Sequence, residues 1–274
     1  LADVADRTPV AAAFLAAAAE RGYPASPDIG GAVRSGAAWN QLNIRRGAKG
    51  PERHDAASAW LDDLPGAKPD LLAGTPVLGL LLEHGRCVGV RLPDREVRCA
   101  GEVVLAAGAI DTPRLLMLSG IGPAAELSAL GIAVAVDRPE VGRDLQDHVL
   151  LAGVVCAASR PVPRSHYNHC DALLYVPADD PADSPEHLVM CLALPMAQPA
   201  LGPMPADAFT LVPCLMRPRS AGSVRLASAD PMAPALIDPA FLADPADLAS
   251  LVQAVERARD LAAAQAFDDW RLRE

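Results

Sequence analysis

The stretch from Val103 to Pro123 constrains the fold more than any other part of the chain. It opens with VVLAAGA, a continuously apolar run typical of a strand buried on both faces of a parallel sheet. The run ends in Ala106, Ala107 and Gly108, whose small side chains let a flat or extended ligand approach the backbone. A tight strand–helix corner without a ligand needs the same small residues, so the pattern alone leaves both interpretations open.

A helix is predicted directly after this strand. Thr112 and Pro113 form a pair typical of the N-cap and the first helical position, and RLLMLS follows them. The free N–H groups and the positive dipole end of such a helix would lie beside the strand end. That arrangement suits an anionic group.

A nicotinamide-type Rossmann unit is the competing interpretation of the same region. Gly120, Gly122 and Ala125 match GxGxxA, and Asp137 follows at about the position of a ribose-binding acid. The helix between them, PAAELSALG, has only about nine residues, whereas a crossover needs a dozen or more. Pro113 also favours a helix over a strand for RLLMLS, so we favour the first interpretation.

Residues 1–148 combine helices with short strands. Thr8 and Pro9 predict the start of one helix, and a second short helix is predicted over 55–61. Three apolar segments between residues 75 and 99 are separated by turn signals and predict an antiparallel meander. Together with the buried strand, these elements indicate an α/β part.

Residues 149–274 follow a different pattern. The strand-like segments ALLYV, HLVMCLALP and FTLVPCLM are separated by proline loops, and helical periodicity extends from Pro245 to Phe267. Strands followed by a helix indicate an α+β unit with an antiparallel sheet. The predicted fold class is therefore α/β combined with α+β, with a domain boundary at His148.

Composition excludes several classes of function. The chain has 24 Lys and Arg against 34 Asp and Glu, with no basic block, so nucleic acid and anionic membranes are not expected partners. Its apolar stretches are far shorter than the roughly 20 residues of a membrane helix, and its start resembles no signal peptide. Six scattered cysteines without a CxxC pair indicate a reduced, cytoplasmic chain, and no metal site is expected because no two ligand pairs lie near each other. No Ser/His/Asp order or Gly-x-Ser-x-Gly elbow supports hydrolase chemistry.

Several motifs resemble one enzyme family, and they occur in that family's order. GAIDTPRLLMLSGIGP is similar to the second signature of the glucose–methanol–choline (GMC) flavoprotein oxidoreductases. VGRDLQDH resembles the family's VGxNLQDH, with Asp144 where Asn is usual. The segment from Arg217 resembles the start of the family's C-terminal region, and GYPASPDIGGA and AASAWL resemble its upstream stretch. The likeness covers nearly the whole chain.

The resemblance implies FAD as cofactor and a small-molecule alcohol as substrate, whose CH–OH group is oxidised by hydride transfer to the flavin. Residues 1–148 would be the C-terminal part of a glutathione-reductase-like FAD-binding domain, including its β-meander and connecting segments. Residues 149–274 would be an incomplete substrate-binding domain.

The resemblance also implies roles for particular residues. Val77 matches the position whose backbone meets the adenine side of FAD, and Ala106, Ala107 and Gly108 match the strand end close to the cofactor. His148 would lie near the flavin end, where a histidine can exchange a proton with a substrate hydroxyl. The alternative is a histidine that holds its turn through hydrogen bonds to the backbone.

Two functional parts of the family are not found in this sequence. No GxGxxG unit precedes the first helix, and no C-terminal catalytic histidine with a His or Asn partner is present. We therefore expect an internal portion of the family fold. The alternatives are a non-catalytic truncated remnant, or one half of a split enzyme whose complementing chain carries the FAD dinucleotide unit.

Overall fold

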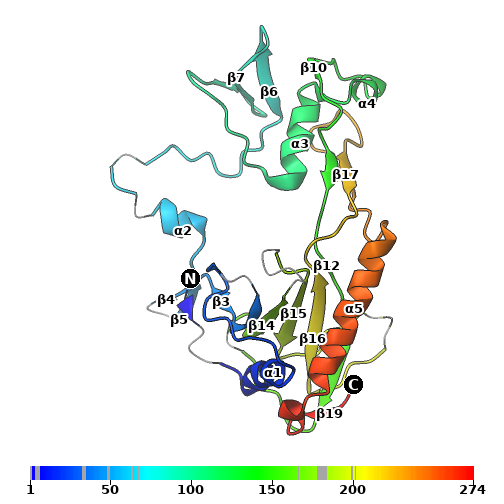
Figure 1. Ribbon diagram of the computed structural model, residues 1–274. Helices are drawn as coiled ribbons and strands as arrows, with labels where there is room; N and C mark the ends of the chain where they lie inside the picture. The colour runs from blue at the N-terminus through cyan, green and yellow to red at the C-terminus, as the bar shows by residue number, and fades with distance from the viewer. Residues whose placement is uncertain are drawn as a thin grey trace. The chain divides into compact units, whose positions relative to one another are not determined.

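The structure is a computed structural model that describes residues 2–3, 7–32, 35–47, 50–62, 64–66, 68–165, 167–177, 184–198, 200 and 202–274. Contacts divide the chain into two compact units (Figure 1). The sheet unit comprises Leu1–Lys68, His148–Pro218 and Asp244–Glu274, and the meander unit comprises Pro69–Asp147 and Arg219–Ala243. Neither unit is continuous in sequence, whereas the sequence analysis placed a single boundary at His148.

A seven-stranded antiparallel sheet forms the centre of the sheet unit. Its order is β19-β13-β16-β15-β14-β2, and β12 also pairs with β16. The strands are β2 Gly36–Trp39, β12 Val149–Leu150, β13 Val154–Ala158, β14 Ala172–Val176, β15 His187–Leu192, β16 Ala208–Leu215 and β19 Arg271–Arg273. The three strands predicted from sequence are β14, β15 and β16, so the antiparallel sheet is confirmed. Pairing of β2 with β14 explains why the N-terminal residues join this unit.

Successive side chains of each strand point to opposite faces of this sheet, and two helices pack on one of these faces. Ala172, Leu174 and Val176 of β14 belong to the core cluster that α1 and α5 complete, whereas Leu173 belongs to a second cluster on the other face. Within the core, the buried rings of Phe209 and Phe267 stack with their centroids 4.9 Å apart.

The ends of these helices follow the sequence signals closely. α1 spans Pro9–Glu20 with Thr8 at its N-cap, as predicted. The Thr8 hydroxyl makes no capping bond; its backbone N–H instead donates to Oδ2 of the buried Asp171 over 2.9 Å. α5 spans Pro245–Ala262, and a 3₁₀ turn, η2, follows over Gln265–Phe267, so the predicted long helix is confirmed with one break.

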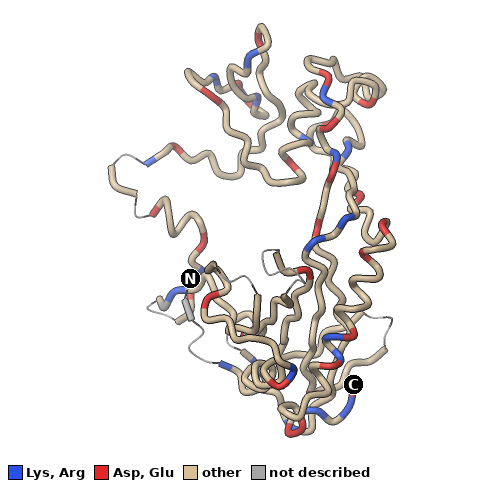
Figure 2. Tube along the Cα trace, viewed as in Figure 1, with Lys and Arg blue, Asp and Glu red and all other residues tan. Residues whose placement is uncertain are grey.

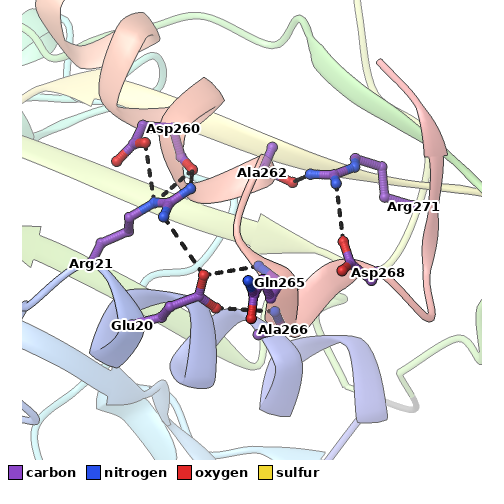
Figure 3. A network of polar contacts seen from close by, with 8 residues as sticks. All are labelled: Glu20, Arg21, Asp260, Ala262, Gln265, Ala266, Asp268 and Arg271. Atoms are coloured by element: carbon purple, nitrogen blue, oxygen red, sulfur yellow. Dashed lines mark hydrogen bonds and ion pairs between the residues drawn. The ribbon is translucent and has the colours of Figure 1, made fainter.

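A polar network joins the C-terminal end of α1 to the end of α5 (Figure 3). The Glu20 carboxylate accepts hydrogen bonds from the backbone N–H groups of Gln265 (2.9 Å) and Ala266 (3.1 Å), which cap η2. Arg21 donates to the Asp260 carbonyl oxygen, and Arg271 donates to that of Ala262. The backbone bonds, above all that from Gln265, hold the pKa of Glu20 below its ordinary value. Carbonyl groups at the end of α5 therefore have charged partners.

The meander unit begins with the predicted antiparallel meander. β6 Gly79–Glu83, β7 Arg86–Arg91 and β8 Glu96–Arg98 pair in sequence order. Acidic and basic residues are interspersed along this part of the chain (Figure 2), and Arg98 donates two hydrogen bonds of 2.8 Å to Glu83. The meander prediction is confirmed.

The remaining elements are short. In the meander unit they are α3 Gly108–Leu118, α4 Ala124–Ala129, the parallel pair β9 Ile121–Gly122 and β10 Val136–Asp137, and the sheet of β11 Arg143–Leu145, β17 Gly222–Arg225 and β18 Leu236–Asp238. In the sheet unit they are β1 Ala2–Asp3 paired with β3 Gln41–Leu42, β4 Ile44–Gly47 paired with β5 Gly50–Arg53, and α2 Ala56–Trp60. The side chain of Asp55 caps α2 by accepting from the Ser58 N–H, which confirms the second short helix. None of the described helices has the length and apolar character needed to cross a membrane.

Two local predictions around residue 103 are wrong. The apolar run is not a strand, and Val104 is 82% exposed, because no described strand pairs with it. The helix begins at Gly108, so Pro113 lies inside α3 rather than at its first position. Because RLLMLS is helical, the Rossmann alternative, which needs a strand there, is excluded.

Removing the ring of Phe267 tests the packing of the sheet unit. Phe267→Ala is expected to lower the free energy of unfolding by about 3–5 kcal/mol, the usual cost of emptying a buried aromatic site. Val252→Ala on the half-exposed side of α5 is the control and is expected to change it by less than about 0.5 kcal/mol. Equal urea midpoints for the two variants would show that the aromatic stack does not hold the core.

Candidate functional site

The meander unit contains a pocket of about 430 Å³. Its walls come from the residues before β6, from segment 103–107 and from the first turns of α3. Val77, Ala106 and Ala107, three of the four predicted cofactor residues, all line it. Most other lining residues are aliphatic, including Val90, Leu105, Leu115 and Leu118.

Hydrogen bonds hold the walls of this pocket in place. The N–H of Leu78, next to Val77, donates to the Arg91 carbonyl oxygen over 2.8 Å, which fixes the entry into β6. The Ser119 hydroxyl accepts from the Leu80 N–H (2.8 Å) and donates to the Leu115 carbonyl oxygen (2.7 Å). One serine therefore joins β6 to the end of α3.

Gly108 acts through its backbone conformation and is not one of the lining residues. Its φ of +76° is left-handed, and a Cβ built there would have no heavy atom within 4 Å. A side chain would have room at this position. Glycine is required by the left-handed backbone turn that leads into α3. The sequence left two explanations open for Gly108, close approach of a ligand or a tight backbone corner, and the structure supports the corner.

The polar edge of the pocket consists of an ion pair. Arg114 Nη1 lies 3.0 Å from Asp111 Oδ1, and its Nη2 donates to the carbonyl oxygens of Pro231 and Ala233. Asp111 stands in the first turn of α3, where it already supplies the negative charge that a helix N-terminus favours. A mostly aliphatic pocket with a neutralised edge suits a flat, weakly charged group better than a phosphate. Neither residue of this pair is among those predicted from the sequence.

His148 is exposed and belongs to the sheet unit, directly before β12. The turn before it explains two residues of the VGRDLQDH motif. A Cβ at Gly142 would lie 2.2 Å from the Val224 carbonyl oxygen, so only glycine fits against β17. Asp144 has a φ of +56°, a conformation that both Asp and Asn tolerate, so its departure from the family's Asn preserves the backbone turn.

The cysteines are present as free thiols, most of them buried. The six cysteines, all within the described residues, form no disulfide. Burial raises the pKa values of the Cys156 and Cys170 thiols to about 12, so both stay protonated and unreactive at neutral pH.

Comparison with known proteins identifies the family. The N-terminal GMC oxidoreductase profile matches residues 2–150, and the C-terminal profile matches residues 218–273. The chain belongs to the GMC oxidoreductase family. The sequence resemblance is thereby confirmed, and the members of this family are FAD-dependent flavoproteins.

Individual relatives agree with this assignment. The chain is 34% identical to choline oxidase from Arthrobacter globiformis over 288 residues, which covers 100% of this chain and 52% of that protein. It is 31% identical to pyridoxine 4-oxidase from Microbacterium luteolum, covering 96% of this chain and 53% of the relative. The crystal structure of pyridoxine 4-oxidase from Mesorbium loti superposes with a TM-score of 0.90 at 34% identity, covering 100% of this chain and 54% of that one. This superposition confirms the mixed α/β class with antiparallel sheets. The chain spans about half the length of the relatives it matches.

A pair of glycine substitutions tests the corner at Gly108. Gly108→Ala is expected to lower the free energy of unfolding of the meander unit by about 1–2 kcal/mol, because alanine disfavours a left-handed backbone. Gly101→Ala is the matched control, since Gly101 has neither a left-handed φ nor a neighbour that a Cβ would meet, and no loss is expected. If denaturant unfolding shows equal stability for both variants, Gly108 is not held in the left-handed conformation.

Proposed function

We propose that this chain is part of an FAD-dependent oxidoreductase that oxidises the CH–OH group of a small alcohol, and that the pocket of the meander unit holds the adenine side of FAD. The observation that carries the proposal is the convergence of Val77 with Ala106 and Ala107 on one pocket. These residues were assigned to the cofactor on sequence grounds alone. Pyridoxine 4-oxidase, choline oxidase and an alcohol dehydrogenase are among the relatives.

The residues present fit the adenine group. A volume of about 430 Å³ lies within the range of about 300–1,000 Å³ usual for small-molecule pockets. The aliphatic side chains of Val77, Val90 and Leu115 would contact the faces of a planar base. No hydrogen bond from the described residues reaches the backbone of 103–105, so these N–H and C=O groups are available to the polar edge of a base or to a neighbouring strand.

The chain's residues would bind and orient the cofactor. FAD, when bound, supplies the ring that accepts the hydride. Ala106 and Ala107 would bring main-chain atoms close to the cofactor, and Gly108 would set the turn that places α3 behind it. The Asp111–Arg114 pair would hold the segment around Pro231 at the pocket edge, since Arg114 donates to two carbonyl oxygens there. We assign His148 as the candidate proton-exchanging residue of this chain, with its turn-holding role as the alternative.

The two parts of the chain would have different tasks. The meander unit would contribute to the FAD site, and the antiparallel sheet of the sheet unit would contribute to the substrate cavity of a cytoplasmic enzyme. The exposure of Val104 favours a complementing segment that covers residues 103–106, because an exposed unpaired apolar run is unfavourable. That segment would carry the FAD dinucleotide unit, either in the same polypeptide or in a separate chain. A remnant without catalytic activity would need another surface in the same place.

Flavin retention by the intact protein tests this function. Purified protein is expected to show flavin absorbance near about 450 nm, which bleaches when an alcohol substrate reduces the ring. Ala106→Leu, which fills the pocket, is expected to weaken FAD binding by at least about tenfold, equivalent to about 1.4 kcal/mol. Ala125→Leu, on an exposed position of α4 in the same unit, is the control and should bind FAD normally.

Two outcomes contradict the proposal separately. Unchanged FAD affinity in Ala106→Leu would remove the pocket assignment. A colourless intact protein that takes up no added FAD would remove the oxidoreductase assignment and leave the remnant.

A further inference from the structure

We infer that Glu186, Ser250 and His187 form a proton-sensitive latch that holds α5 on the sheet and loosens when His187 takes up a proton. The three side chains come from two places far apart in sequence, the start of β15 and the first half of α5. None of them belongs to the pocket of the meander unit.

The latch is a chain of two hydrogen bonds. His187 Nε2 lies 2.8 Å from Ser250 Oγ, and the same hydroxyl donates to Glu186 Oε1. His187 is 1% exposed and Ser250 is buried, whereas Glu186 lies at the surface. The two hydrogen bonds therefore connect a buried imidazole to an exposed carboxylate through one serine hydroxyl.

The number of protons available determines which of the three side chains donates and which accepts in each hydrogen bond. An ionised Glu186 can only accept a hydrogen bond, so the single Ser250 proton points toward it. Ser250 Oγ must then accept from His187, which places the imidazole proton on Nε2. Nδ1 of His187 is left as a bare acceptor, and it is buried without a partner among the described residues. Because serine stands in the middle, this is not a nucleophilic triad, in which histidine must lie between serine and the acid.

Protonation of His187 would disturb this arrangement. It would add a donor at Nδ1 where the described residues provide no acceptor, and it would place a charge between β14, β16 and α5. The residues opposite His187 on the neighbouring strands are Val176 and Leu215, which offer no compensating group. The loss of stability would affect the packing of α5, because Ser250 of this helix is the hydrogen-bond partner of His187.

The charges around the imidazole act in opposite directions. Burial lowers the pKa of His187 most strongly; Glu186 raises it, Arg257 on α5 lowers it, and a hydrogen bond with the Ser250 backbone raises it. Asp247, also buried on α5 one turn before Ser250, and the exposed Glu256, next to Arg257, are the other ionisable groups on this part of the helix. The net direction is a pKa below the ordinary histidine value, so His187 is neutral at pH 7.

The sign of the pH dependence follows. A histidine whose pKa is lower in the folded than in the unfolded state binds fewer protons when folded. Its contribution is complete above the unfolded pKa of about 6.5 and is lost progressively as the pH falls below that value. The carboxylate of Glu20, at the end of α1, accepts the two bonds that cap η2 and takes up a proton only at lower pH, since its pKa is depressed from 4.5. The interval from pH 7.5 to pH 5.5 therefore separates the effect of His187 from that of Glu20, and the His187→Gln variant separates it from the other histidines.

Hydrogen exchange of the α5 amides in the intact protein tests the latch. After correction for intrinsic exchange rates, the protection of α5 is expected to fall by up to about tenfold between pH 7.5 and pH 5.5. His187→Gln keeps an amide donor for Ser250 but cannot titrate, so its protection should not change over this interval. His84→Asn is the control, because Asn tolerates the left-handed turn at this exposed position, and it should lose protection as the wild type does.

Two results would overturn the inference. One is a wild-type protein whose α5 protection does not fall, and the other is an equal fall in His187→Gln. If His187→Gln does not fold, the NMR titration of the His187 ring in the wild type decides. A ring titrating below the ordinary histidine value in step with α5 exchange supports the latch, and a titration that leaves α5 unchanged contradicts it.

Discussion

The backbone N–H and C=O groups of every extended segment need hydrogen-bond partners, and this constraint determines how the chain is arranged. In the sheet unit the need is met by segments far apart in sequence: β2 pairs with β14, and the C-terminal β19 pairs with β13. In the meander unit residues 103–106 are apolar and form no strand, and no described strand pairs with them. A segment of this kind is stable in water only when a neighbour supplies hydrogen bonds and covers its side chains. The same exposed backbone forms one wall of the pocket.

The structure distinguishes two explanations for the small residues at 106–108 that the sequence alone left open. Small residues at a strand end serve either close ligand approach or a tight corner. Ala106 and Ala107 line the pocket, whereas Gly108 does not line it and instead provides a left-handed corner. The motif therefore combines both tasks in adjacent residues. The family assignment does not depend on this corner alone, because the two family profiles match residues 2–150 and 218–273.

Local signals in the sequence predicted local structure well. Thr8-Pro9 and the turns of the meander gave the correct helix and strands, because capping and turn chemistry depend on neighbouring residues, whereas the similar pair Thr112-Pro113 lies inside α3. The run at residue 103 reads as a strand, but strand formation depends on partners that its own sequence does not contain. The contacts of Arg114 with the carbonyl groups of residues 231 and 233 and the Glu186–Ser250–His187 chain were missed because these partners are brought close only by folding. Periodicity carries no information about such contacts.

Amide exchange at residues 103–107 tests the central claim most directly. In the intact protein loaded with FAD, these amides are expected to exchange slowly and to speed up when the cofactor is removed, because strand pairing and cofactor contact would both protect them. Rapid exchange that is the same with and without FAD would show that the segment is neither a paired strand nor a wall of the cofactor site.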